Sequence, residues 1–152
     1  MTSDLAVPTT EELEALVGWR FPGGTYTVEP WRVWLTNDVV GADQRTDGVA
    51  HPMFCYYAAM AGMGLSIAEL FTLCSASADD GPMFGESDIT QHRSLEIGTT
   101  YTVRGEITSA VRKQGARTGT FDIVAFRLEV VAPDGEVSAV VSNSFIYPRR
   151  TP

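Results

Sequence analysis

The chain has 152 residues, a length that suits one domain with an ordinary core and is short for two. Hydrophobic residues make up 44% of it and charged residues 20%, which argues against disorder and against a fibrous repeat. The formal net charge of −8 would repel a phosphate backbone, so we do not expect nucleic acid as a partner. We therefore predict a single domain over residues 1–152.

No stretch of the sequence reaches the ~20 uninterrupted apolar residues of a membrane span. The longest apolar segment, residues 53–74, is interrupted by Ser66, Glu69 and Thr72. Residues 1–4 lack the basic and apolar regions of a secretory signal. We therefore expect a cytoplasmic protein with no membrane partner.

The first forty residues predict two helices and a strand. Thr9 or Thr10 can cap a short helix that ends near Gly18. Residues 25–28 have the β-branched and aromatic composition of a strand, and Pro30 suits the first turn of a second helix. The apolar residues of this second helix recur at helical spacing and are expected in the core: Trp31, Trp34, Leu35, Val39 and Val40.

A long apolar segment, residues 51–74, follows a polar stretch and predicts one buried helix that begins at Pro52. Small residues on its surface, among them Ala58 and Gly62, permit a close approach of the helix to a sheet or a ligand. Cys55 and Cys74 lack metal-ligand spacing and are expected to be buried as small hydrophobes.

The second half, from residue 83 onward, reads as an antiparallel meander. Apolar and polar residues alternate over residues 101–108, a glycine-containing loop follows at 112–119, and a second strand runs from 120 to 131. Pro133, Asp134 and Gly135 form a turn before a last strand at 137–147. Asp122 and Arg127 interrupt an apolar strand, and we expect both to face solvent. The sequence thus predicts an α+β fold with one helix on one antiparallel sheet.

Several short groups of residues then follow one another in a particular order. They are Gly-Val-Ala-His-Pro-Met-Phe at 48–54, Phe-Gly-Glu at 84–86, His-Arg-Ser-Leu at 92–95, Ile-Gly-Thr-Thr-Tyr at 97–101, Arg-Lys-Gln-Gly at 112–115, Asp-Gly at 134–135 and Phe-Ile-Tyr-Pro-Arg at 145–149. In this order they resemble the MaoC-like (R)-specific enoyl-thioester hydratases and dehydratases, especially the N-terminal dehydratase-like repeat of that family. The resemblance covers most of the chain, from about Val17 onward.

The resemblance implies the hotdog fold, in which an antiparallel sheet wraps around one long central helix. It also implies a homodimer, or a heterodimer with another hotdog subunit, and a substrate carried as a thioester of coenzyme A or of an acyl carrier protein. No cofactor is expected, because no metal cluster or phosphate-binding glycine loop is visible. The helix residues predicted to contact the substrate are Met53, Phe54, Tyr57, Met60 and Gly62.

The chain differs from the family in the residues that carry out the reaction. Catalytic members share a run of the form DxNPxHxD, whose Asp and His handle the water that is added or lost. Residues 41–48 occupy that place here without the Asn-Pro and without the histidine. Of the two histidines in the chain, His51 can form a displaced dyad with Asp43 or Asp47, or it can simply bond the loop that leads into the helix. His92 is more typical of a structural histidine.

Three functions are therefore open. The chain is a hydro-lyase acting on enoyl or 3-hydroxyacyl thioesters, or a non-catalytic hotdog subunit that pairs with a catalytic partner. The third is a repurposed hotdog thioesterase or cyclase of polyketide-type substrates, for which Glu69 is a candidate acid. The simpler interpretation of Glu69 is an exposed position on the helix.

Overall fold

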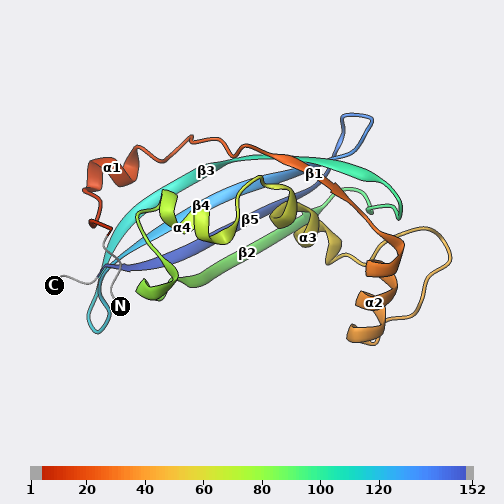
Figure 1. The fold of residues 1–152 in the computed structure, drawn as a ribbon, viewed down its shortest axis with the longest axis horizontal. Helices are drawn as coiled ribbons and strands as arrows, with labels where there is room; N and C mark the ends of the chain where they lie inside the picture. The colour runs from red at the N-terminus through yellow and green to blue at the C-terminus, as the bar shows by residue number, and fades with distance from the viewer. Residues whose placement is uncertain (1–4, 150–152) are drawn as a thin grey trace.

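The computed structural model describes residues 5–149 and shows an antiparallel sheet curved around a helix (Figure 1). Residues 1–4, on which the expectation about a leader rests, and residues 150–152 lie outside this range. The sheet has five strands in the order β1-β3-β4-β5-β2, and every pair is antiparallel. The strands are β1 (Gly24–Thr27), β2 (Met83–Gln91), β3 (Thr100–Gly115), β4 (Gly119–Val131) and β5 (Val137–Arg149). The predicted α+β class and the meander are confirmed.

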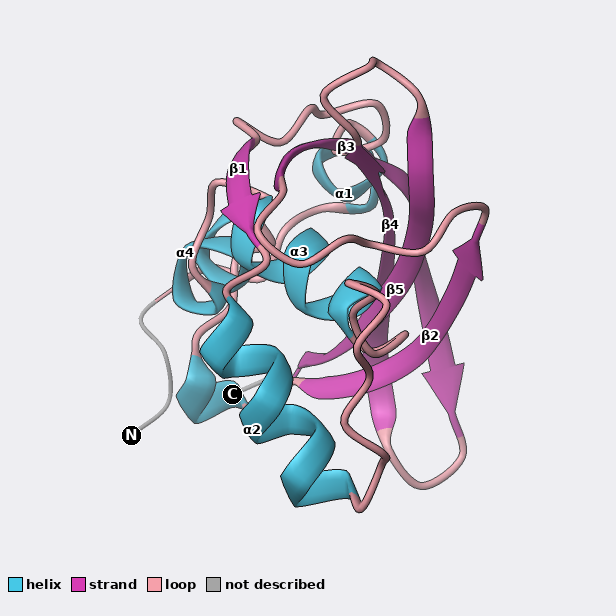
Figure 2. Ribbon diagram, turned by 90° about the vertical axis from the view of Figure 1, so that its right-hand side faces the viewer, coloured by secondary structure: helices cyan, strands magenta, loops and turns pink. Residues whose placement is uncertain are grey.

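The helices lie mainly on the concave side of the sheet, and Figure 2 shows α2, α3 and α4 together on that side. They are α1 (Thr10–Glu14), α2 (Pro30–Val40), α3 (Phe54–Gly62) and α4 (Ile67–Leu73), followed by a 3-10 turn, η1 (Ala78–Asp80). Among residues 5–149 no single helix is long and apolar enough to span a membrane, and only α3 and α4 taken together, bent by 60°, pass that test.

The predicted single helix over residues 51–74 is wrong in one respect, because α3 and α4 are separate helices. Gly64 between them has a φ of 83°, which an L side chain rarely adopts, so the helical path stops there. Ser66 then starts α4 with a capping box, in which its hydroxyl accepts from the N–H of Glu69 and the Glu69 carboxylate accepts from the N–H of Ser66. This break turns α4 away while α3 alone crosses the sheet.

Close packing holds α3 against the sheet. A Cβ on Gly62 would lie 2.4 Å from Cγ2 of Val103 on β3, so only glycine permits this approach. Ala58 and Ala59 are fully buried on the same helix, and the core continues into large side chains such as Phe126. The small residues therefore serve the packing between helix and sheet, as predicted.

The apolar residues of α2 are not in the core, which contradicts the prediction for this helix. Trp31, Trp34 and Val39 are 59%, 58% and 75% exposed, and only Val33 and Asn37 are buried. Helical spacing correctly predicted the helix but not its surroundings. The consequence is a large apolar helix surface that nothing in residues 5–149 covers.

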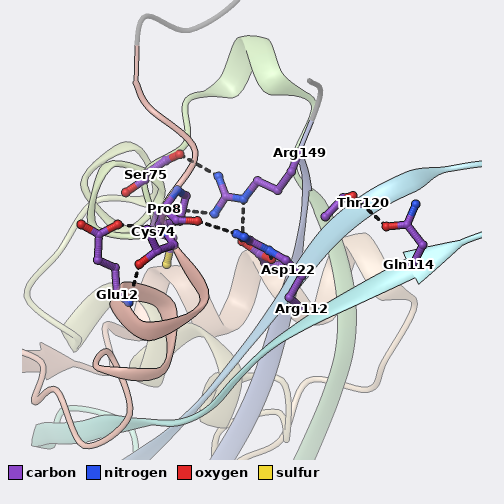
Figure 3. A network of polar contacts seen from close by, with 10 residues as sticks. Pro8, Glu12, Cys74, Ser75, Arg112, Gln114, Thr120, Asp122 and Arg149 are labelled. Atoms are coloured by element: carbon purple, nitrogen blue, oxygen red, sulfur yellow. Dashed lines mark hydrogen bonds and ion pairs between the residues drawn. The ribbon is translucent and has the colours of Figure 1, made fainter. Parts of the chain in front are cut away.

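Asp122 is buried, whereas the sequence predicted a solvent-facing side chain; Arg127 is exposed as expected. Figure 3 shows Asp122 between Arg112 and Arg149, whose Nε atoms donate to its two oxygens at 2.7 Å each. Arg149 also donates to the carbonyls of Cys74 and Ser75, and Arg112 to that of Pro8. This ionic cluster joins the N-terminal segment, the end of α4 and three strands, β3, β4 and β5.

Candidate active site

The loop between α2 and α3 encloses a cavity of about 310 Å³. It is lined by Asn37, Ala42, Asp43, Arg45, Ala50, His51 and Pro52. The loop leaves α2 at Gly41, which has the left-handed conformation typical of a residue that ends a helix. Two of the three predicted catalytic residues, Asp43 and His51, therefore line one cavity at the start of the central helix.

Backbone and side-chain contacts fix this loop at both ends. At its start, the N–H of Ala42 donates to the carbonyl of Asn37, and the amide of Asn37 donates to the side-chain oxygen of Gln44 at 3.3 Å. At its end, the N–H of Ala50 donates to the carbonyl of Leu95 at 2.8 Å. The loop is thereby held in place next to the N-terminus of α3.

One ring nitrogen of His51 already accepts a hydrogen bond. The N–H of Met53 donates to Nδ1 of His51 at 3.2 Å, so Nδ1 is the unprotonated nitrogen. In the neutral ring the proton then lies on Nε2, which can donate a hydrogen bond. A general base needs a free lone pair facing the substrate, which this arrangement does not provide.

Asp47 forms an ion pair with Arg45. The guanidinium of Arg45 donates to both carboxylate oxygens, and the N–H of Val49 donates to Oδ1 at 3.2 Å. The hydrogen bond from Arg45 and then the one from Val49 hold the pKa of Asp47 below its usual range. A carboxylate with a lowered pKa is a weaker base, so the pairing with Arg45 works against catalysis by Asp47.

Asp43 differs from Asp47 because its carboxylate has no hydrogen bond or ion pair to a side chain or backbone group among residues 5–149. No direct hydrogen bond between Asp43 and His51 is present in that range either. The structure thus brings the two residues to the same cavity without forming the dyad. The lining residues Arg45 and Asn37 were not predicted, and no short motif in the sequence marks them.

The five helix residues predicted to contact a substrate have separate surroundings. Phe54 and Tyr57 line a second hollow of about 400 Å³ between α2 and α3, while Met53 is partly exposed at the helix start. Met60 faces the sheet, where its sulfur accepts from the amide nitrogen of Asn143 at 3.1 Å. Gly62 packs on β3 as described above. Only Phe54 and Tyr57 therefore share a hollow.

Asn143 was not predicted from the sequence and is the polar residue nearest to this part of the helix. Its side chain is buried, and its Oδ1 has no hydrogen-bond partner within the described range. It interrupts a run of apolar residues on the concave face of β5. A single polar residue in an apolar strand carries no spacing signal that would have indicated it.

The two cysteines behave as the sequence predicted. Both are buried, and burial raises the pKa of the Cys74 thiol, which disfavours the thiolate that a nucleophile needs. Within residues 5–149 no three side chains of His, Cys, Asp or Glu come together as a metal site. The cysteines therefore supply no activated nucleophile, and the described residues form no metal site.

No family model matches the sequence, and a comparison with curated proteins finds no match either. Solved structures do match. A MaoC-like dehydratase aligns with a TM-score of 0.67 at 19% identity, over 89% of this chain and 43% of that one, so this chain spans less than half of that protein. The ChsH1-ChsH2 complex from Mycobacterium tuberculosis aligns at 0.66 and 18%, over 94% and 92%.

A third match is the C-terminally truncated HadBC complex, a (3R)-hydroxyacyl-ACP dehydratase, also from Mycobacterium tuberculosis. Its TM-score is 0.64 at 19% identity, and the alignment covers 86% of this chain and 96% of that one. At such low identities the likeness establishes the fold. The chain has the MaoC-like hotdog fold, as the resemblance implied.

Proposed function

We propose that this chain is a hotdog subunit of an acyl-thioester hydratase or dehydratase, and that a partner subunit carries the acid and base. The single observation behind this proposal is that Nδ1 of His51 already accepts from a backbone N–H. Addition or loss of water across a Cα–Cβ bond needs a base and an acid within reach of the same small volume. His51 in this state can donate a hydrogen bond, but it cannot act as that base.

The proposed role of the cavity is to hold the thioester, with His51 as the donor that positions it. Donation from Nε2 to a thioester carbonyl would stabilise the negative charge that develops there during the reaction. Enoyl and 3-hydroxyacyl thioesters are the substrates for which such a donor is useful. The fold neighbours support this type, because their names include a 3-hydroxyacyl dehydratase and a MaoC-like dehydratase.

A hotdog partner is proposed to join along β2. This strand lies at the edge of the sheet next to β5, and all nine of its residues are exposed. An open edge with exposed apolar side chains is a template for another strand. Two of the fold neighbours are complexes by name, HadBC and ChsH1-ChsH2, which supports assembly with a second hotdog chain.

The test measures hydration of crotonyl-CoA by the purified chain, alone and co-expressed with a hotdog protein that carries the intact Asp and His motif. We expect no turnover alone and clear turnover in the complex. Replacing the partner's motif His should abolish activity, whereas His51→Ala here should lower it by about 10²- to 10³-fold, as for one lost donor.

A second candidate, catalysis by this chain alone, is favoured by one observation: within residues 5–149 the carboxylate of Asp43 has no hydrogen bond or ion pair, and it lines the same cavity as His51. Turnover by the isolated chain that is lost in Asp43→Asn would establish this candidate and overturn the subunit proposal. Release of free thiol instead of hydration would indicate a thioesterase.

A further inference from the structure

The edge strand β2 belongs to an apolar surface that extends over three elements. The ring of Phe84 on β2 contacts Tyr56 on α3, with centroids 6.5 Å apart, and Tyr56 contacts Tyr57. Tyr57 in turn lines the hollow that Trp31 and Leu35 of α2 complete. We call Phe84, Tyr57, Trp31 and Leu35, all exposed, the apolar strip. In Figure 1 α2 lies on the same side of the molecule as β2, the lowest strand.

The same edge carries negative charge only. Strand β2 (Met83–Gln91) contains Glu86 and Asp88 and no lysine or arginine. Glu86 and Asp88 flank Ser87 in the strand, and Asp88 is paired with Ser142, so both carboxylates lie on the face opposite to Ser87. Ser87 between them is the partner of Asn143, whose side chain faces α3. The two carboxylates therefore lie on the convex face, opposite to the helices.

The positions of these carboxylates oppose pairing of β2 with a second copy of itself in the three central registers, those with the two-fold axis at Glu86, Ser87 or Asp88. If two copies join with their helices on the same side, residues of the convex face meet residues of the convex face. With Ser87 on the two-fold axis, Glu86 of each copy lies opposite Asp88 of the other. If the two-fold axis passes through Glu86 or Asp88, that carboxylate lies opposite the same residue of the other copy. Like charges directly opposite one another destabilise a strand pair.

We infer that the strand that pairs with β2 belongs to a different chain and presents lysine or arginine opposite Glu86 and Asp88. The inference rests on the proposed pairing through β2, and it names the chemistry of the partner. The formal charge of −8 on each copy adds to the repulsion between two identical chains. The apolar strip supplies attraction to any partner, and the two carboxylates select among partners.

A charge-reversed copy of this chain is a defined probe for that partner. The variant Glu86→Lys/Asp88→Lys has the same fold and the same apolar strip, with a basic edge in place of the acidic one. Wild type, variant and their equal mixture are compared by sedimentation velocity, and isotope labelling with native mass spectrometry identifies mixed dimers. We expect the mixed dimer to have a Kd at least about tenfold lower than either homodimer at low salt.

The matched control is Glu11→Lys/Glu14→Lys, which makes the same change in net charge on exposed positions of α1. The mixture of this control with wild type should show no preference for a mixed dimer. About 0.5 M NaCl should reduce that preference in the mixture of wild type with Glu86→Lys/Asp88→Lys. A wild-type homodimer as tight as the mixed dimer would overturn the inference in favour of a second copy. Absence of a mixed dimer would overturn it as well. Because mass and not turnover is measured, the result is independent of the thioester assay.

Discussion

Asp122 shows how much a single buried residue can organise in this chain. Its carboxylate is fully buried and is bound by two guanidinium groups, which in turn bind carbonyls of distant segments. We predict that Asp122→Asn lowers the free energy of unfolding by about 3–5 kcal/mol, since it leaves Arg112 and Arg149 without their counter-charge. Urea unfolding followed by circular dichroism measures this loss.

The control for this prediction is Arg127→Gln, an exposed cation on the same strand, for which we expect a loss of about 1 kcal/mol or less. An Asp122→Asn protein that unfolds at the same urea concentration as wild type would show that the buried cluster adds nothing to stability. Burial of Asp122 could not be predicted, because a charged residue in an apolar strand is usually solvated. Only the positions of Arg112 and Arg149 in space explain it.

At the scale of elements, the strands and the helices were each predictable only in part. The loop predicted at 112–119 is shorter in the structure, because β3 continues to Gly115. Strand limits follow from period-two alternation and turn residues, and the predicted strand at 120–131 matches β4 (Gly119–Val131) almost residue for residue. The break between α3 and α4 depends on the left-handed Gly64, and glycine alone does not reveal its conformation. Periodicity placed α2 in the core because apolar spacing indicates a helix but does not show what covers its apolar side chains.

At the candidate site, too, the sequence indicated residue types but not their contacts. The sequence indicated Asp43, Asp47 and His51 by residue type, and the structure brings Asp43 and His51 to one cavity. It could not indicate that Arg45 would bind Asp47 or that Nδ1 of His51 would accept from Met53, because both depend on the path of the loop. The roles of these residues in the reaction therefore stay a prediction.

Between strands β3 and β4, Glu129 accepts hydrogen bonds from Arg104 at 2.8 Å and Arg127 at 2.6 Å. The hydrogen bond from Arg104 is the main cause that lowers the pKa of Glu129 from its ordinary value of 4.5; burial opposes it, and the bond from Arg127 lowers the pKa further. A carboxylate with a lowered folded-state pKa adds stability that is complete above the unfolded pKa. That stability is lost as the pH falls through the folded pKa.

Glu129→Gln should therefore be less stable than wild type by about 0.5–1 kcal/mol near pH 7. The difference should shrink as the pH falls from about 7 through the folded-state pKa of Glu129, because the wild-type carboxylate then becomes protonated as well. Urea midpoints of both proteins over this range test it, with the exposed Glu14→Gln as a control that changes little at any pH. A difference that is constant with pH would mean that packing, not charge, accounts for the effect of Glu129.

For the whole molecule, the proposed partner subunit would cover both the exposed apolar surface of α2 and the open edge of β2. Tryptophan fluorescence reports on whether α2 becomes covered, because Trp31 and Trp34 are largely exposed while Trp19 packs against the core. We predict that acrylamide quenches the fluorescence of the isolated chain strongly. In the mixed dimer of wild type with Glu86→Lys/Asp88→Lys, quenching should fall on the order of twofold, as expected when an interface buries aromatic residues.

The variant Trp31→Phe/Trp34→Phe, introduced into both chains, keeps the apolar helix but leaves Trp19 as the reporter, so its quenching should not change on association. If the mixed dimer forms and the wild-type signal is also unchanged, the partner contacts β2 without reaching α2. The apolar strip would then end at α3, and the surface of α2 would require a separate ligand. A decrease in quenching would instead show that one partner closes both the strand edge and the hollow between α2 and α3. Only in that case would an acyl chain bound there be enclosed by two subunits.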